Sequence, residues 1–157
     1  MLTEDMKRVL REQRLAFVAT ASPDGTPNLS PKGTIVALDD ERIAFLDLRS
    51  PGTVANLRAN PAIEINVVDQ VARKGYRFRG RAEVVDEGPH FDRVLAAYAE
   101  QDESMALEVG KRVRAAVVIH VERAAPLVSP GYDWVASEDE MRQHWLHYWR
   151  ELWGTRE

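Results

Sequence analysis

The sequence contains no cysteine among its 157 residues. This absence excludes a disulfide framework, a thiol nucleophile, an iron–sulfur cluster and a thiolate zinc site. The fold must therefore be stabilised by its hydrophobic core and by any partner subunit. Hydrophobic residues make up 45% of the chain, which together with its length is typical of one soluble globular domain.

Long hydrophobic runs are missing as well. The longest, such as Ala115–Ile119, fall far short of the roughly 20 residues that cross a bilayer. Residues 1–14 carry charges throughout and lack the apolar centre of a signal peptide. We therefore expect a cytoplasmic location and no membrane partner.

Neither sign of charge dominates, because 21 Lys and Arg residues oppose 25 Asp and Glu residues. The net charge of −4 provides no overall attraction to phosphate backbones, so we expect no nucleic-acid partner. The glycine-rich dinucleotide loop and the Walker loop are also absent, as is the Gly-x-Ser-x-Gly motif of hydrolases.

Six segments have the alternation or the apolar content of β-strands, and short turns separate several of them. They are residues 15–21, the segment from Thr26 onward, and residues 43–48, 63–68, 76–85 and 113–121. In 76–85, apolar residues and glycine alternate with Arg77, Arg79 and Arg81, which predicts one buried and one exposed face. The segment 113–121 is apolar at nearly every position, which predicts that both of its faces are covered.

Four segments have the pattern of helices. Residues 3–13 begin at Thr3 as an N-cap, a second helix runs from Ser50-Pro51 to Asn60-Pro61, and a third begins at Gly88-Pro89. The last begins at a capping box of Ser137 and Glu140. Its apolar seam consists of Met141, Trp145, Tyr148, Trp149 and Leu152, and we expect its tryptophans to lie in the core or in a subunit interface.

These elements predict a mainly β fold, a small six-stranded antiparallel β-barrel with peripheral helices. A doubly wound sheet is disfavoured, because helices do not alternate regularly with the strands. We assign residues 1–135 to the barrel domain. Residues 136–157 form a C-terminal helix of the same domain that packs on the barrel or on a partner subunit.

The strongest candidate site is Arg49–Thr53, at a strand-to-helix junction. The free N–H groups of Gly52 and Thr53 and the positive end of the helix dipole would face outward beside two hydroxyls and a guanidinium. Such an arrangement suits a phosphate monoester. The alternative is that Ser50 only caps its own helix and that Arg49 is solvated.

Two further segments carry suitable cations. Arg73 and Lys74 enter the strand 76–85 and could close on the same phosphate, while Gly75 would let a flat ligand approach the backbone. Lys32 shares a strand face with Ser30 and is a candidate electrostatic partner for a ring system. The alternative for the alternating arginines of this strand is a solvated face or a protected edge.

A metal site is less well supported. His144 and His147 lie three residues apart on the last predicted helix, with Glu140 and Glu151 each one turn away. Such spacing arises readily on a solvated helical face, so we assign no metal ligand.

Several stretches resemble, in one collinear order over residues 5–130, the pyridoxamine 5′-phosphate oxidase-like family of FMN-binding split barrels. The stretches are Phe17–Thr20 (FVAT), Pro23–Lys32 (PDGTPNLSPK), Asn56–Pro61 (NLRANP), Arg79–Glu83 (RGRAE), Glu87–Phe91 (EGPHF) and Arg114–Ile119 (RAAVVI). The resemblance implies a six-stranded antiparallel split barrel, a homodimer, and FMN bound at the subunit interface.

The resemblance also implies which residues bind the cofactor. Carried over by position, they are Lys32, Gly33, Asp47, Leu48, Arg49, Ser50, Thr53, Asn56, Lys74, Gly75 and Tyr76. Arg73 is added to this set because its charge could close on the same phosphate. Many relatives have a basic residue where this chain has Gly52, so the phosphate charge would be met by Arg49, Arg73 or Lys74. The Arg-Leu-x-Pro ending of true pyridoxine-phosphate oxidases is replaced by Trp153–Glu157, which argues against the oxidation of vitamin B6 phosphates.

We therefore expect an FMN-binding oxidoreductase that exchanges hydride or electrons with a small-molecule substrate or electron donor. No catalytic acid or base is assigned, because the flavin itself would carry the chemistry. One alternative is a flavin carrier or sensor without turnover. Another is the same barrel with a deazaflavin or haem, in which case His120 or His90 could be an axial ligand.

Overall fold

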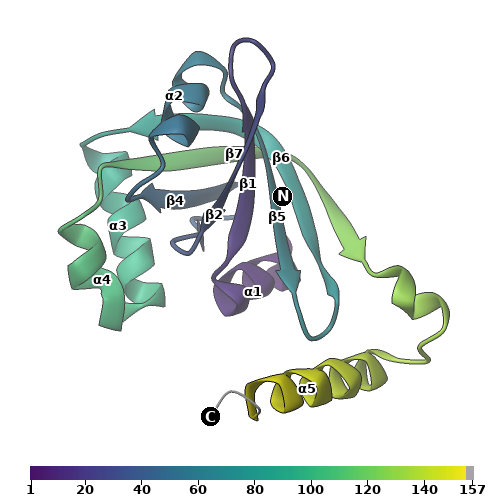
Figure 1. Cartoon of the computed structure of the whole chain (residues 1–157). Helices are drawn as coiled ribbons and strands as arrows, with labels where there is room; N and C mark the ends of the chain where they lie inside the picture. Colours follow the sequence, from purple (N-terminus) through teal and green to yellow (C-terminus); the bar gives the residue numbers. More distant parts are fainter. Residues whose placement is uncertain (155–157) are drawn as a thin grey trace.

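The computed structural model describes residues 1–154 and forms one seven-stranded antiparallel sheet in the order β2-β1-β5-β6-β7-β4-β3. The strands are β1 (Ala16–Ala21), β2 (Pro27–Lys32), β3 (Val36–Ala37), β4 (Arg42–Asp47), β5 (Ala62–Asp69), β6 (Lys74–Val85) and β7 (Ala115–Val128). The sheet curls into a half-barrel with helices at its periphery (Figure 1), which confirms the predicted fold class.

Five α-helices and one 3-10 helix surround this sheet within residues 1–154. They are α1 (Glu4–Gln13), α2 (Pro51–Ala59), α3 (Pro89–Gln101), α4 (Glu103–Gly110), the 3-10 helix Pro130–Asp133 and α5 (Glu138–Gly154). The Thr3 hydroxyl caps α1 by accepting a hydrogen bond from the Met6 N–H. None of these helices combines the length and the apolar character that a bilayer crossing requires.

Two hydrophobic clusters cover the two faces of the sheet around β7. Inside the barrel, Leu10 of α1 packs with Phe45, Phe78 and neighbouring aliphatic side chains. On the other side, Val94 and Tyr98 of α3 lie against β4 and β7 in a second cluster. Because β7 alternates between the two clusters, nearly all positions of its first half are buried, as its continuous apolar sequence predicts.

The structure differs from the prediction in three elements. The short strand β3 raises the number of strands from six to seven, and α4 follows α3 after a break at Asp102. Strand β7 also continues to Val128, beyond the predicted end at residue 121, because β6 pairs with it along its length. Apolar periodicity does not reveal these features, since β3 has only two residues and the second half of β7 is largely exposed.

Two glycines of β6 lie where a neighbouring backbone leaves no space for a side chain. A Cβ atom on Gly80 would lie 2.0 Å from the carbonyl oxygen of His120, beside the register shift between Arg79 and Gly80. A Cβ atom on Gly75 would lie 2.0 Å from the carbonyl oxygen of Val67. The close pairing with β5 therefore requires glycine at position 75, independently of any ligand that approaches the backbone there.

The end of β7 and the 3-10 helix extend away from the barrel, and α5 then turns back to lie beneath the tip of the β5–β6 hairpin (Figure 1). Of its predicted seam, only Met141 is buried, whereas Tyr148 is 46% exposed. Trp145 and Trp149 are only partly buried and Trp153 is 62% exposed, so the tryptophan stripe does not lie in the core of this chain, and its place in a subunit interface stays a prediction. The last three residues of the predicted segment 136–157 lie outside the described residues.

Candidate cofactor site

The start of α2 lies against the end of β2, and a buried lysine joins them. The Lys32 ammonium donates hydrogen bonds to the hydroxyl oxygens of Ser50, at 2.6 Å, and Ser30, at 2.7 Å. The Ser50 hydroxyl in turn donates to the Asp47 carboxylate, which also accepts the Ser50 N–H at 3.0 Å. The structure therefore brings together three of the predicted residues, Lys32, Asp47 and Ser50, and it places Lys32 at the start of α2.

The Ser50 side chain does not cap α2. Its hydroxyl is committed to Asp47 and Lys32, so the interpretation of Ser50 as an ordinary N-cap is wrong. Pro51 occupies the first helical turn and has no N–H to satisfy. The N–H groups of Gly52 and Thr53 have no acceptor within residues 1–154, so both are available to an anion.

Burial lowers the pKa of Lys32, and the charge of Asp47 opposes this shift only in part. The residue as a whole is 6% exposed. A buried ammonium retains unfavourable desolvation energy, which an additional anion would reduce. The site is thus electrostatically prepared for a negatively charged group.

A hydrogen-bond network of amides and hydroxyls connects α2 to the strands β1 and β2. The Asn28 amide donates to the hydroxyl oxygens of Thr20 and Thr53, at 3.2 and 3.1 Å. The Asn56 amide donates to the same Thr20 oxygen at 3.1 Å. Because Thr20 lies on β1 and Asn28 on β2, the network fixes α2 to two strands.

A hollow of about 310 Å³ opens beside this network. It is lined by Ser30, Pro31, Lys32, Gly33, Thr34, Leu46, Leu48 and Arg49. Arg49 is exposed, and no ion pair involves it within the described chain. The predicted residues Gly33, Leu48 and Arg49 therefore border one hollow together with the buried lysine.

The second predicted group, residues 73–76, lies in a different place. It begins β6 at the β5–β6 hairpin, which points toward α5, whereas α2 lies at the other end of the barrel (Figure 1). Lys74 forms an ion pair with Glu138 at 3.1 Å, and the Arg73 guanidinium stacks over Trp145 at 3.4 Å from the ring centroid. Within one chain, these side chains are therefore engaged with α5.

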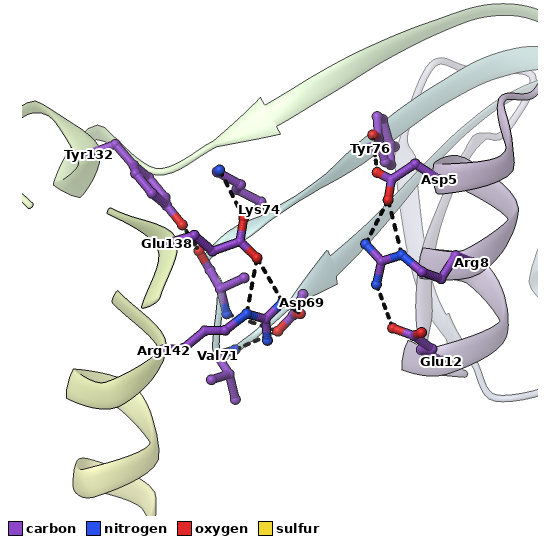
Figure 2. Close-up of polar contacts among 11 residues, drawn as sticks. Asp5, Arg8, Glu12, Asp69, Val71, Lys74, Tyr76, Tyr132, Glu138 and Arg142 are labelled. Atoms are coloured by element: carbon purple, nitrogen blue, oxygen red, sulfur yellow. Dashed lines mark hydrogen bonds and ion pairs between the residues drawn. The ribbon is translucent and has the colours of Figure 1, made fainter. Parts of the chain in front are cut away.

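Figure 2 shows two polar networks around this second group. On one side, Tyr76 donates to Asp5, which also binds Arg8, and this lowers the pKa of Asp5. On the other side, Arg142 of α5 donates to Asp69 at 2.8 Å and to Glu138 at 3.0 Å. A cavity of about 250 Å³ is lined by residues of both networks. Each charged residue that lines this cavity has an ion pair or a hydrogen bond with another residue of the chain.

The histidines are placed away from the hollow beside Lys32. His120 is exposed on β7, and His90 lies 3.9 Å from Glu83. His147 lies 3.4 Å from Glu151 on the solvent side of α5. Within residues 1–154, no group of three or more His, Asp or Glu side chains is arranged to hold a metal ion.

Sequence reasoning missed Thr20 and Thr34. Thr20 is the shared acceptor of the amide network, and Thr34 binds both the N–H and the C=O of Leu46. Both are buried polar residues, at 5% and 7% exposure. A threonine in an apolar strand is unremarkable in sequence, so only the alternation of β1, which places Thr20 on the inner face, could have indicated it.

Comparison with known proteins agrees with this architecture. The family model described as pyridoxamine 5′-phosphate oxidase matches residues 2–127. An uncharacterized protein of Methanocaldococcus jannaschii is 32% identical over 122 residues, which are 76% of each chain. The crystal structure of HupZ from Group A Streptococcus is 33% identical, with a TM-score of 0.69 over 82% of this chain and 96% of that one.

More distant structures share the fold with different ligands in their names. An FMN-binding protein from Syntrophomonas wolfei is 15% identical, with a TM-score of 0.64 over 80% of this chain and 86% of that one. HutZ, a haem storage protein from Vibrio cholerae, and an F420 reductase have TM-scores of 0.65 and 0.58. These likenesses concern the fold alone, whereas the family match extends over most of the sequence. The chain belongs to the pyridoxamine 5′-phosphate oxidase family.

Proposed function

We propose that the protein is a flavoprotein that binds FMN, with the FMN phosphate at the start of α2. The observation that carries this proposal is the buried Lys32 ammonium held at the Ser50 hydroxyl, next to a hollow bordered by Arg49. Lys32 and Arg49 line this hollow, and the N–H groups of Gly52 and Thr53 at the start of α2 have no acceptor within residues 1–154. This donor set fits a dianionic phosphate monoester.

Each donor has a distinct task in this proposal. Lys32 supplies a fixed charge, because its hydrogen bonds to Ser30 and Ser50 restrict its position. Arg49 is exposed and supplies a guanidinium that can close over the phosphate. The amide network around Thr20 keeps α2 and its N–H groups in place, so little reorganisation accompanies binding.

A second copy of the chain would complete the site. The outer face of β1 and β2 presents Phe17, 46% exposed, and Leu29, 66% exposed, and the strand register places Ala19 opposite Leu29. A half-exposed apolar sheet face of this kind is typical of a subunit interface. We propose a homodimer across this face, with the flavin ring at the interface and residues 73–76 of each subunit near the cofactor.

The bound flavin would supply hydride or electron transfer. The chain's own residues then bind and orient: the donors at α2 anchor the phosphate, and the apolar strand face excludes water from the ring. No acid or base in the chain is required to move a proton at the site beside Lys32. The proposed activity is accordingly that of an oxidoreductase acting on a small-molecule substrate or electron donor.

The test is the absorption spectrum of the purified protein, followed by titration of the apo-protein with FMN and riboflavin. Two charge-assisted contacts to the phosphate predict that FMN binds about 100-fold more tightly than riboflavin. Equal affinities, or no flavin binding, would contradict the proposal. A Soret band would indicate haem instead, and reduction without any acceptor activity would indicate a carrier or sensor.

The Arg49→Gln variant tests the anchor itself, and Arg11→Gln is its control, since Arg11 is exposed on α1. Arg49→Gln should weaken FMN binding about tenfold and leave riboflavin binding unchanged. The control should change neither affinity. A parallel loss of both ligands in Arg49→Gln would show that Arg49 does not act on the phosphate.

A further inference from the structure

A second hollow borders the site at α2 and is lined mainly by cations. Its volume is about 660 Å³, and its lining residues are Leu48, Arg49, Lys111, Arg112, Val113 and Arg114. Four of these six residues are basic and none is acidic. Leu48 and Arg49 also line the hollow beside Lys32, so the two hollows are adjacent.

The topology of the sheet explains why these cations meet. The β4–β7 ladder ends at the pair Asp47 and Ala115, and the Arg114 N–H still donates to the Asp47 carbonyl at 2.9 Å. Beyond that point the two segments diverge, because β4 continues into α2 and the residues before β7 come from α4. Arg49 on one side and residues 111–114 on the other therefore flank the same end of the ladder.

The local charge is strongly positive although the chain as a whole is acidic. Glu108 pairs with Lys111 at 2.8 Å and with Arg112, and these hydrogen bonds lower the pKa of Glu108. One carboxylate thus offsets two cations at the end of α4. Arg49 and Arg114 have no ion pair within residues 1–154, so their guanidinium groups are available to a ligand.

We propose that this hollow binds a second anionic group, a phosphate or a carboxylate, adjoining the phosphate of the bound flavin. The inference rests on the proposed function, because Arg49 is shared by both sites. It assigns the ligand chemistry: the molecules that meet at this end of the barrel carry at least two separate anionic groups. The second group belongs either to an extended cofactor tail or to a separate anionic substrate.

The hollow is large enough for this assignment. Its 660 Å³ exceeds the volume of the hollow beside Lys32, about 310 Å³, so the two together could hold more than one phosphate. A planar guanidinium binds phosphate and carboxylate in the same bidentate manner. Arg114 is the diagnostic residue, because it lines the second hollow only.

The experiment uses calorimetric titration of the full chain and of two variants, Arg114→Gln and Arg123→Gln. Arg123 is an exposed arginine on the same strand, β7, and lines neither hollow, so it is the matched control. The apo-proteins are titrated with FMN and with FAD, whose second phosphate tests a cofactor tail. The FMN-loaded proteins are titrated with inorganic pyrophosphate and citrate, which test a separate anionic substrate.

Arg114→Gln should weaken the binding of FAD, or of pyrophosphate and citrate, about tenfold while FMN binding stays within about twofold. Weaker binding of FAD alone identifies a cofactor tail, and weaker binding of the free anions identifies a substrate subsite. The proposal is overturned when none of these affinities responds to Arg114→Gln, or when Arg123→Gln has the same effect.

A failure of the proposed function gives a different result. In that case the wild-type chain does not bind FMN, and pyrophosphate is titrated into the protein without flavin. Binding that depends on Arg114 would then support the anion site alone. Binding of FMN without any effect of Arg114→Gln on the other ligands would support the flavin site alone.

Discussion

The ammonium nitrogen of Lys32 lies 2.6 Å from the hydroxyl oxygen of Ser50, which joins the end of β2 to the residue before α2. This contact places a buried charge at a helix start whose serine does not serve as a cap. The desolvation that lowers the pKa of Lys32 is the same property that favours an incoming anion. The buried charge therefore lowers the stability of the free protein and raises its affinity for an anionic ligand.

The first prediction concerns Lys32 itself. Lys32→Met removes the charge while keeping an unbranched chain of similar length, so it should weaken FMN binding about tenfold to a hundredfold. Riboflavin affinity should change little, since the charge acts on the phosphate in this model of binding. Arg11→Met on α1 is the control for a general loss of positive charge. Fluorescence titration of both variants with the two flavins provides the measurement.

An equal loss of FMN and riboflavin affinity would place Lys32 at the flavin ring rather than at the phosphate. The thermal midpoint of Lys32→Met separates binding from folding. Because the buried ammonium is unfavourable in the free protein, we expect the midpoint to stay close to that of the wild type. A large decrease would mean that Lys32 is needed mainly to compensate Asp47.

The second prediction is a pH dependence of FMN affinity. The phosphate monoester loses its second proton at about pH 6, so FMN affinity should fall as the pH decreases below that value. Burial lowers the pKa of Lys32 below the ordinary 10.5, so affinity should also fall on the alkaline side before that pH is reached. Lys32→Met should lose the alkaline decrease and keep the acid one. An alkaline decrease of equal size in the variant would contradict the assignment.

The same shift predicts the sign of a stability change in the free protein. Between the lowered pKa of Lys32 and 10.5, the unfolded chain holds more protons than the folded chain. The contribution of Lys32 to stability therefore becomes less unfavourable as the pH rises through that window. Urea denaturation of wild type and Lys32→Met at several alkaline pH values measures the difference.

The arrangement of the candidate site is predictable from sequence only where it depends on local motifs. Arg49–Thr53 combine a strand end, a proline and a helix start, so the orientation of the N–H groups follows from the sequence alone. Lys32 was named, but its bond to Ser50 was not, because the two residues are separated along the chain and meet only through the barrel. Thr20 was missed for the same reason, since its partners Asn28 and Asn56 come from other elements.

The fold was predictable where the hydrophobic pattern is long. The alternation of β6 is identified from the sequence with its buried face, as Phe78 confirms. The periodicity of α5 was misleading. An apolar seam indicates that one face of a helix must be covered, but it does not indicate which part of the protein covers that face. In this chain α5 is attached by the ion pair of Arg142 with Asp69 and by two residues of its seam, Met141 and Trp145, while Tyr148 stays exposed.

The third prediction concerns this attachment. Arg142→Ala removes the ion pair that joins α5 to Asp69, at 2.8 Å, together with a pair within α5 to Glu138, and should weaken the attachment by about 1 kcal/mol. Hydrogen exchange in residues 138–154 should become faster, while exchange in β7 stays unchanged. Arg150→Ala is the control, since Arg150 is exposed on the same helix. Unchanged exchange in Arg142→Ala would show that other contacts hold α5.

This attachment should also depend on pH. Burial acts to raise the pKa of Asp69, but hydrogen bonds from the Ala72 N–H and Arg142 outweigh it, so the net shift is downward from 3.8. A carboxylate with a lowered pKa contributes stability above its unfolded pKa and loses it as the pH falls through the folded value. The protection factors of the α5 amides, which take out the pH dependence of intrinsic exchange, should therefore decrease below about pH 4.

The fourth prediction uses two glycines. Gly80→Ala would place its Cβ atom 2.0 Å from the His120 carbonyl oxygen, so the β6–β7 pairing must shift, with a loss of about 1–3 kcal/mol. Gly110→Ala is the control, because a Cβ atom there meets nothing within 4 Å and Gly110 ends a helix. Chemical denaturation should show destabilisation in the first variant and a small stabilisation in the second. Equal stabilities would contradict the close approach at the bulge.

The last prediction tests the proposed homodimer through the outer face of β1 and β2. Leu29 is 66% exposed there, and Leu107 is 70% exposed on α4, away from that face, so the two leucines form a matched pair. A glutamate at the centre of an apolar interface leaves an uncompensated charge, so Leu29→Glu should raise the dimer dissociation constant about 100-fold. Leu107→Glu should leave it unchanged.

Analytical ultracentrifugation over a range of concentrations measures both constants, and FMN titration of the same samples links assembly to the cofactor. Because the proposed ring site lies between subunits, Leu29→Glu should also weaken FMN binding at concentrations where it is monomeric. A monomeric wild type, or a Leu29→Glu variant that stays dimeric, would contradict an interface on this face.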